Sequence, residues 1–190
     1  MRSKFIDKTI DYTGEQLRSH YICETFGLEG DAIIGFIGAC RVKEHMVDLS
    51  DKLKKEFIRS DRMLHFIIEH FDGDLEKAVL RKRLMVSIIG EHISRVRVND
   101  HSPLPAPLCR RDNGLYIGNK KLSVAVATAS PVSTLIHIGL NISSKNTPVK
   151  TIGLKDLGIE PKKLALDVIE LYCKEIDSIR QSRCKVAGVK

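Results

Sequence analysis

The sequence predicts an α+β fold, in which a mainly antiparallel, mixed sheet is flanked by helices. Two observations indicate this class. Residues 32–42, 113–128 and 134–142 follow strand patterns, whereas residues 74–96 and 161–180 carry apolar side chains at helical spacing. These segments run in the order strand, helices, antiparallel strands, helix, and not in the βαβ alternation of a parallel sheet.

The first half of the chain contains one expected strand and three expected helices. The strand is "AIIGFIGACRV", residues 32–42, an apolar run bounded by polar segments. Helices are expected over residues 49–58, 60–71 and 74–96. The second would start at a Ser60 or Asp61 cap and end at the turn signal "DGD". The third has apolar residues three to four positions apart.

A proline-rich connector near residues 99–111 separates the two halves. It holds three prolines within five residues, which excludes a helix or the interior of a sheet. The hairpin and the strand over 134–142 follow. A final helix begins at Pro161 and covers about 161–180, with an expected buried stripe of Leu164, Val168, Leu171, Tyr172, Ile176 and Ile179.

Composition limits the classes of partner. At 190 residues and 43% hydrophobic content, the chain is expected to form a single domain over residues 1–190. The 31 basic and 24 acidic side chains give a net charge of +7, which favours anionic partners. Basic residues are dispersed and aromatic residues make up only 5%, so a nucleic-acid partner is disfavoured.

The cysteines and the start of the chain predict a cytoplasmic protein. Five cysteines without a C-x-x-C spacing do not fit a disulfide framework or a zinc ribbon. The start, "MRSKFIDKTIDYTG", lacks the apolar core of a secretory signal, and "AIIGFIGAC" is too short to cross a bilayer. No membrane partner is expected. Two glutamines and five asparagines are few, which favours a thermophilic source.

The hairpin places an unusual set of side chains on one face. A turn at Gly118-Asn119 would pair Tyr116 with Lys121. Strand alternation then separates an apolar face from one that holds Gly114, Tyr116, Lys121, Ser123, Ala125 and Ala127. The next strand has a similar row of His137, Gly139 and Asn141. If the two rows share a side of the sheet, they outline a hollow with Lys121 as its fixed cation. Alternatively, the small residues admit a packed helix, and Lys121 extends to water.

The same segments resemble a known family. "RRDNGLYIGNKKLSVAVAT" followed by "LIHIGLNI" resembles the central segment of biotin protein ligases, and the matching positions are Asn113, Leu115, Tyr116, Lys121, Leu122, Gly139 and Asn141. The chain as a whole resembles an archaeal family of uncharacterised proteins through "LRSHY", "EHMVDLSD" and "KLSVAVATASPVSTLIHIGLNI".

The resemblance implies the fold shared by biotin and lipoate protein ligases and class II aminoacyl-tRNA synthetases. It also implies that Lys121 contacts the carboxylate or phosphate of an acyl-adenylate, with ATP and Mg²⁺ as cofactors. A lysine ammonium suits that role because it neutralises charge that develops at an acyl-phosphate. Asn113 would lie by the adenine or ribose. The remaining candidate binding residues are Arg110, Arg111, Tyr116, Ser123, His137, Gly139 and Asn141.

Departures from the ligase pattern leave several functions open. Arg111-Asp112 replaces Trp-Pro, Gly114 replaces Asp, and the glycine-rich loop of the ligases is absent. One hypothesis is a nucleotide-dependent ligase or acyltransferase that uses Lys121. The second is a binding or sensor protein that kept the pocket without catalysis, and a weaker third is an RNA-associated protein. The expected partner is a small carboxylated or phosphorylated ligand. Two further partners remain open as alternatives, an acceptor protein and a second copy of the chain in a homodimer.

Two other clusters contain side chains that can ligate a metal ion, and no metal is expected at either. His65, Glu69 and His70 fall in the expected helix 60–71, where His65 and His70 would lie about 140° apart and could not share a zinc ion. The acids and histidine after the first strand are Glu44, His45, Asp48 and Asp51. They either ligate Mg²⁺ or form a polar connector with helix-capping acids, and the connector is the favoured interpretation.

Overall fold

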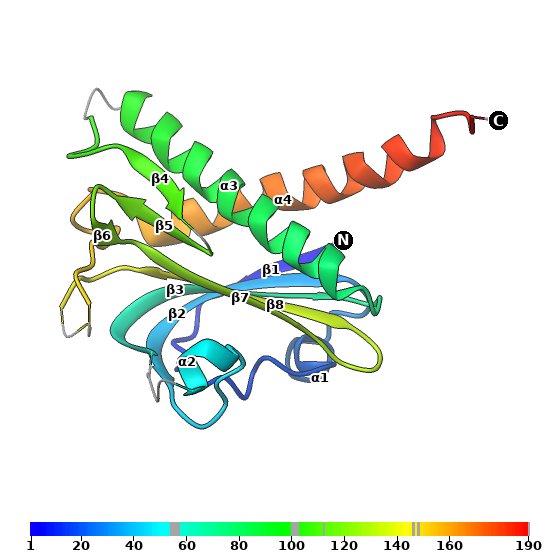
Figure 1. Cartoon of the computed structure of the whole chain (residues 1–190), viewed down its shortest axis with the longest axis horizontal. Helices are drawn as coiled ribbons and strands as arrows, with labels where there is room; N and C mark the ends of the chain where they lie inside the picture. Colours follow the sequence, from blue (N-terminus) through cyan, green and yellow to red (C-terminus); the bar gives the residue numbers. More distant parts are fainter. Residues whose placement is uncertain (54–57, 100–102, 112, 146, 148, 190) are drawn as a thin grey trace.

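A computed structural model describes residues 1–53, 58–99, 103–111, 113–145, 147 and 149–189 (Figure 1). Its main sheet has the strand order β1-β2-β3-β8-β7, in which β1 is parallel to β2 and all other neighbours are antiparallel. The strands are β1 (Arg2–Ile6), β2 (Ala32–Val42), β3 (Ile58–His70), β7 (Ser123–Ala129) and β8 (Thr134–Asn141). The predicted mixed, mainly antiparallel sheet is therefore confirmed.

A second, small sheet and four helices complete the described part of the chain. The small sheet has the order β4-β5-β6 and consists of β4 (Leu108–Arg111), β5 (Gly114–Ile117) and β6 (Lys120–Lys121). The helices are α1 (Tyr21–Phe26), α2 (Leu49–Leu53), α3 (Leu75–Asn99) and α4 (Pro161–Cys184). The long helices α3 and α4 cover one face of the main sheet, and the short α1 and α2 lie beside the opposite face (Figure 1).

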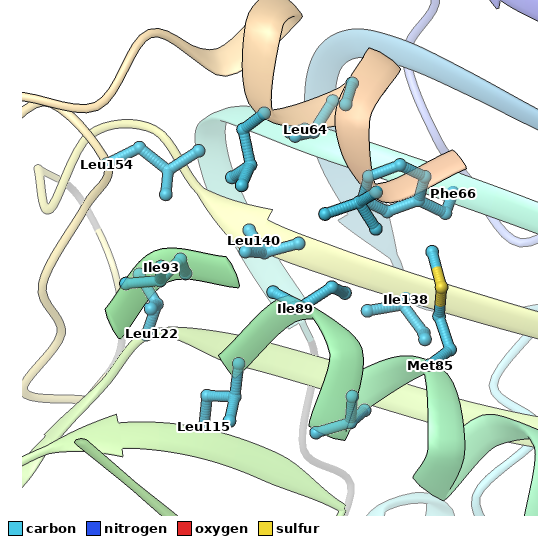
Figure 2. Packing of buried hydrophobic residues seen from close by; sticks show 14 of the residues in the cluster. Leu64, Phe66, Met85, Ile89, Ile93, Leu115, Leu122, Ile138, Leu140 and Leu154 are labelled. Carbon is cyan, nitrogen blue, oxygen red and sulfur yellow. The ribbon is translucent and has the colours of Figure 1, made fainter. Parts of the chain in front are cut away.

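The larger core lies between the main sheet and the two long helices. Leu64 and Phe66 of β3 pair with Leu140 and Ile138 of β8, so all four side chains point to the same face. Figure 2 shows Met85, Ile89 and Ile93 of α3 packed over Ile138 and Leu140. Each such side chain removed from water contributes roughly 1.5–3 kcal/mol to stability. A second core on the opposite face contains Ile34, Phe36, Met63 and Ile67, covered by Tyr12 and Ile22.

The expected helix over residues 60–71 is wrong, because this segment forms β3. From Met63 onward its even positions, such as Phe66, face the α3 and α4 side, and its odd positions, such as Ile67, face the other core, whereas a register shift with β2 lies between Ser60 and Met63. A strand that is buried on both faces is apolar throughout, and periodicity alone does not distinguish it from a buried helix. Of the expected helix 49–58, α2 covers Leu49–Leu53, and residues 54–57 lie outside the described residues.

The two long helices confirm the sequence patterns. Helix α4 begins at Pro161, and the side chain of Glu160 accepts hydrogen bonds from the backbone N–H groups of Lys162 and Lys163. This cap satisfies two donors that the first turn leaves unpaired. The expected stripe is buried at Leu164, Val168, Tyr172 and Ile176, but Leu171 is half-buried and Ile179 is exposed.

The hairpin register is confirmed, but the hairpin is shorter than expected. Tyr116 pairs with Lys121 in the small sheet, and then the chain crosses into the main sheet, where Ser123 pairs with Leu140. Leu122 and Ser123 are both buried at the crossing, so the alternation of faces is reset there. Consequently Ala125 and Ala127 pack against the core under α3 instead of sharing a face with Tyr116 and Lys121.

Candidate functional site

A cavity of about 350 Å³ lies on the α1 and α2 side of the main sheet. Five described parts of the chain contribute to its wall: one face of β3, β7 and β8, the small sheet, the segment that follows β2, the segment between β1 and α1 through Tyr12, and the three residues Thr147, Val149 and Thr151. Apolar side chains form much of the wall, and they include Met46, Ile58, Met63, Val124, Val126 and Val149. Polar and charged side chains interrupt this apolar surface at defined places.

The structure brings together six of the nine candidate binding residues. Those that line the cavity are Arg111, Asn113, Tyr116, Lys121, His137 and Asn141. Arg110 is exposed on β4 and is not part of the lining. Ser123 is buried below the wall, where its Oγ accepts a hydrogen bond of 2.9 Å from the backbone N–H of Leu115.

Gly139 shapes the cavity without lining it. A Cβ atom at this position would lie 2.8 Å from Cε of Met63 and 3.4 Å from Cε1 of His137. Both of those side chains are part of the cavity wall. The glycine therefore leaves the room that Met63 and His137 need in order to reach their places.

Lys121 is held in the wall through its backbone. Its N–H donates to the carbonyl of Lys150 at 3.0 Å, and its carbonyl accepts from the N–H of Ile152 at 3.1 Å. Strand β6 is thus fixed on one side by β5 and on the other by residues 150–152. The half-buried side chain of Lys121 lines the cavity, whereas the neighbouring Lys120 is exposed and lies outside it. Among the described residues, none forms an ion pair or hydrogen bond with the Lys121 ammonium.

A buried lysine that the sequence patterns did not single out orients Asn113. Nζ of Lys82 in α3 donates to Oδ1 of Asn113 at 2.7 Å, and only 5% of Lys82 is exposed. Burial lowers the pKa of Lys82. Because an ammonium only donates hydrogen bonds, the Asn113 oxygen must face it, and the amide NH₂ is left for a ligand. Lys82 lies between Val79 and Val86 on the apolar stripe of α3, which is the signal that would have identified it.

The charged groups in the described lining are mainly cationic. They are Lys121, Arg59 and Arg111, together with one carboxylate, Asp48, and the titratable ring of His45. The Arg111 guanidinium stacks over the Tyr116 ring at 5.4 Å from its centroid and donates to the carbonyl of Gly118 at 3.1 Å. These contacts hold Arg111 at the rim. The excess of positive charge makes this part of the cavity suitable for an anion.

Ser60 places an unpaired hydroxyl group in the same wall. It follows Arg59 in β3, lines the cavity and is only 2% exposed. Its Oγ is buried without a hydrogen-bond partner among the described residues. Such a group costs about 1–3 kcal/mol when it remains unpaired. A ligand that hydrogen-bonds to Ser60 would recover that cost.

Two histidines and a tyrosine form the opposite end of the cavity. Nδ1 of His65 lies 3.0 Å from Nε2 of His137, and the Tyr12 ring stacks on His137 with centroids 3.7 Å apart. Tyr12 and His137 line the cavity, whereas His65 lies behind them. Burial lowers the pKa of His65 to about 4, against a smaller opposing effect of the Gly38 backbone, and burial also holds the pKa of His137 well below its usual value. The pair is therefore neutral at pH 7.

Glu69 and His70 have separate structural partners on opposite faces of β3. Oε1 of Glu69 accepts from the backbone N–H of His20 at 2.9 Å and from the Ser133 hydroxyl at 2.7 Å. On the other face, Nε2 of His70 lies 2.9 Å from the Tyr172 hydroxyl. His65, Glu69 and His70 thus belong to three different environments.

The part of the chain that the structure describes contains no group of three or more side chains placed to hold a metal ion. Of the acidic segment after β2, His45 pairs with Glu15 at 3.4 Å, Asp48 lines the cavity, and the side chain of Asp51 lies outside the described residues. Within the described residues, none of the helices combines the length and apolar character needed to cross a bilayer.

The comparisons with known proteins agree with this architecture. A family model described as a domain of unknown function (DUF366) matches residues 1–187. The chain belongs to this family. It is 38% identical over 185 residues to Uncharacterized protein MJ0805 of Methanocaldococcus jannaschii, covering 93% of this chain and 80% of the relative. It is 33% identical to a solved protein of unknown function from Pyrococcus horikoshi, with a TM-score of 0.88 over 99% of this chain and 100% of that one.

More distant solved structures share the fold. Biotin protein ligase from Aquifex aeolicus, in complex with biotin and ATP, has a TM-score of 0.58 at 13% identity, covering 95% of this chain and 72% of the ligase. Ta0514 from T. acidophilum, described as a candidate lipoate protein ligase and solved with bound lipoic acid, has a TM-score of 0.55 at 13% identity, covering 92% and 86%. The expected biotin/lipoate ligase-like fold and the resemblance to an archaeal family are therefore confirmed.

Proposed function

We propose that the protein binds a small amphipathic acid in the cavity, with the anionic group of the acid against Lys121. The observation that carries the proposal is the half-buried ammonium of Lys121 in a largely apolar wall, where none of the described residues pairs with it. A cation in such a place attracts an anion more strongly than one in bulk water, because the local dielectric constant is lower.

Other features of the cavity support the same ligand class. A volume of about 350 Å³ lies within the range of roughly 300–1,000 Å³ that small-molecule sites occupy. Arg111, Arg59 and the hydroxyl of Ser60 supply further donors in the cavity wall, while Met63, Val124 and Val126 offer an apolar surface for a hydrocarbon chain. The Asn113 amide, oriented by Lys82, adds a donor that suits a base or ribose oxygen.

We propose further that the bound acid is activated with ATP, as in a ligase or acyltransferase that forms an acyl-adenylate. Support comes from the shared fold and from the Aquifex ligase, which binds biotin and ATP. Lys121, Arg59 and Arg111 would hold phosphate oxygens, and Asp48 offers a carboxylate oxygen of the kind that Mg²⁺ prefers. The ammonium of Lys121 would then stabilise the charge that develops as the carboxylate attacks the α-phosphate.

The alternative is a sensor that binds the acid without turnover. The absence of a glycine-rich loop from the sequence favours this second candidate, because such loops surround the phosphates with backbone N–H groups. Pyrophosphate release distinguishes the two functions. A ligase should release pyrophosphate when ATP, Mg²⁺ and octanoate, lipoate or biotin are mixed with the protein, and the rate should fall about 100-fold or more in Lys121→Ala. Binding of an acid without any pyrophosphate would establish the sensor.

Two adjacent lysines offer a matched test of the binding site. Lys121→Ala should weaken the binding of octanoate about tenfold or more, because it removes the buried cation that faces the carboxylate. Lys120→Ala removes the same charge from an exposed position and should change the affinity less than twofold. Isothermal titration of both variants measures the difference. Equal losses in the two variants would mean that only the overall positive charge matters, and the proposed site would be wrong.

A further inference from the structure

The end of the cavity opposite Lys121 is neutral and contains a hydrogen-bonding group that faces the ligand space. His137 lines this end, is 3% exposed, and forms its hydrogen bond with His65 through Nε2. Within the described residues, none hydrogen-bonds to its other nitrogen, Nδ1. The stacked Tyr12 ring, inclined by only 10° to the imidazole, prevents the His137 ring from turning.

The hydrogen bond between the two neutral rings can run in either direction, and its direction determines which nitrogen of His137 carries the proton. In one arrangement Nδ1 of His65 donates to Nε2 of His137, and the proton of His137 lies on Nδ1. In the other, Nε2 of His137 donates to Nδ1 of His65, and the proton of His65 lies on its own Nε2, a buried nitrogen without a hydrogen-bond partner among the described residues. The Gly38 and Ala39 backbone groups favour a proton on the His65 ring. In the second arrangement Nδ1 of His137 carries no proton and can accept a hydrogen bond from a ligand.

We propose that His137 is a specificity-determining hydrogen-bond acceptor, whose tautomer is set by His65, and that it selects acids with a hydroxyl or N–H donor at the end remote from the carboxylate. This inference rests on the proposed binding of an acid at Lys121 and names the subclass of acid. The neutrality of the pair matters here, because a protonated His137 would present a donor and would prefer an acceptor on the ligand.

The spacing of the two ends sets the length of the ligand. His137 and Asn141 are four residues apart in β8, so their Cα atoms are about 13 Å apart. The side-chain amide of Asn141 donates to the backbone carbonyl of Lys121 at 3.3 Å, so Lys121 belongs to the far end. Val124 lies between the two ends, since it pairs with Gly139, and Val126 lies beside His137, its partner in the register of β7 with β8. An acid with a medium-length hydrocarbon chain therefore places its carboxylate at Lys121 and its terminal group at His137.

Octanoate and ω-hydroxyoctanoate provide a matched pair of probes. We expect the wild-type protein to bind ω-hydroxyoctanoate about tenfold more tightly in isothermal titration, since only this acid donates to Nδ1 of His137. His137→Phe keeps a ring for Tyr12 to stack on but removes the acceptor, so the ratio of the two affinities should fall to about one.

Variants of His65 distinguish a positioning role from simple packing. In His65→Asn the side-chain oxygen can take the place of Nδ1 and accept from Nε2 of His137, so the preference should persist. In His65→Leu the acceptor is lost, so the preference should weaken. Urea unfolding of this variant serves as the control that it still folds. Nitrogen-15 NMR of the histidine rings in the free protein should show the Nε2–H tautomer for both His65 and His137.

Each unfavourable outcome has a separate meaning. Equal affinity of the wild type for the two acids, or an Nδ1–H tautomer of His137, overturns this inference and leaves the anion site at Lys121 in place. Failure of the wild type to bind either acid overturns the proposed function, and this inference with it. Loss of the preference in His65→Asn as well as in His65→Leu assigns His65 to packing alone and overturns its role in setting the tautomer.

Discussion

Replacement of Gly38 by alanine is expected to destabilise the protein by about 3 kcal/mol or more, which is among the larger effects of a single substitution. A Cβ atom at this position would lie 1.8 Å from the carbonyl oxygen of Ile10 and 2.5 Å from its carbon. These are backbone atoms, which cannot move aside as the tip of a flexible side chain can. The clash is therefore relieved only if the segment that contains Ile10 leaves the sheet.

That segment is firmly attached to β2. The N–H of Ile10 donates to the carbonyl of Ile37 at 3.1 Å, and the N–H of Tyr12 donates to the carbonyl of Ala39 at 2.8 Å. Its displacement would break these hydrogen bonds and remove Tyr12 from its stack on His137. Gly38→Ala should therefore perturb the His137 end of the cavity as well as the stability of the fold.

Urea unfolding measures the loss, with Gly35→Ala as the control. A Cβ at Gly35 would approach Cδ1 of Ile169 at 3.1 Å and Cδ2 of Phe5 at 3.3 Å, both of them side-chain atoms that can shift. Gly35→Ala should lower the free energy of unfolding by only about 1 kcal/mol. If the two variants lose the same stability, residues 10–12 do not lie against β2 in the way described.

Acidification should destabilise the protein well before its carboxylates titrate. His65 has an ordinary pKa near 6.5 when unfolded, and burial lowers this pKa to about 4 in the folded protein. Between these two values the unfolded state binds more protons than the folded state, so stability falls as the pH falls through this window. From pH 7 to pH 5, His65 alone should remove about 2 kcal/mol from the free energy of unfolding. His137 acts in the same direction, because burial also lowers its pKa.

Urea unfolding at pH 7 and at pH 5 tests this expectation. His65→Asn should be less stable than the wild type at pH 7 but should lose about 2 kcal/mol less on acidification, because it has no buried imidazole to protonate. His20→Asn is the control, since its ring is exposed and asparagine tolerates the left-handed backbone at this position (φ 63°). An unchanged slope in His65→Asn would show that His65 is not held neutral by burial.

Much of the site could be predicted from the second half of the chain, because its local patterns are strong. The Gly118-Asn119 turn sets the pairing of Tyr116 with Lys121, and alternation places His137 and Asn141 on one face of β8. Strand alternation predicts Ser123 on the face of Lys121, and this prediction is wrong because the chain changes sheets immediately after Leu122. Local sequence carries no signal for such a crossing. Leu122 is buried there in the hydrophobic core, whereas Ser123 is buried with its hydroxyl bonded to the backbone N–H of Leu115.

The part of the cavity wall that comes from the first half of the chain could not be predicted, and the reason is physical. Arg59, Ser60 and Met63 lie on β3, whose run of apolar residues is compatible with a buried helix as well as with a strand. Tyr12 reaches the cavity from a segment without regular structure of its own, held by hydrogen bonds to β2. The sequence patterns do not predict strand β1 either. Its short, charged sequence is paired on one side only, at the edge of the sheet, where apolar alternation is not required.

A crystal structure of the protein with ω-hydroxyoctanoate is the most direct test of the central claim, that Lys121 presents a positive charge to an acid inside the cavity. We expect the carboxylate to lie within hydrogen-bonding distance of the Lys121 ammonium, with the hydrocarbon chain along Val124 and Val126. An acid bound elsewhere on the molecule, with the Lys121 ammonium directed into solvent and away from the cavity, would contradict the proposed function.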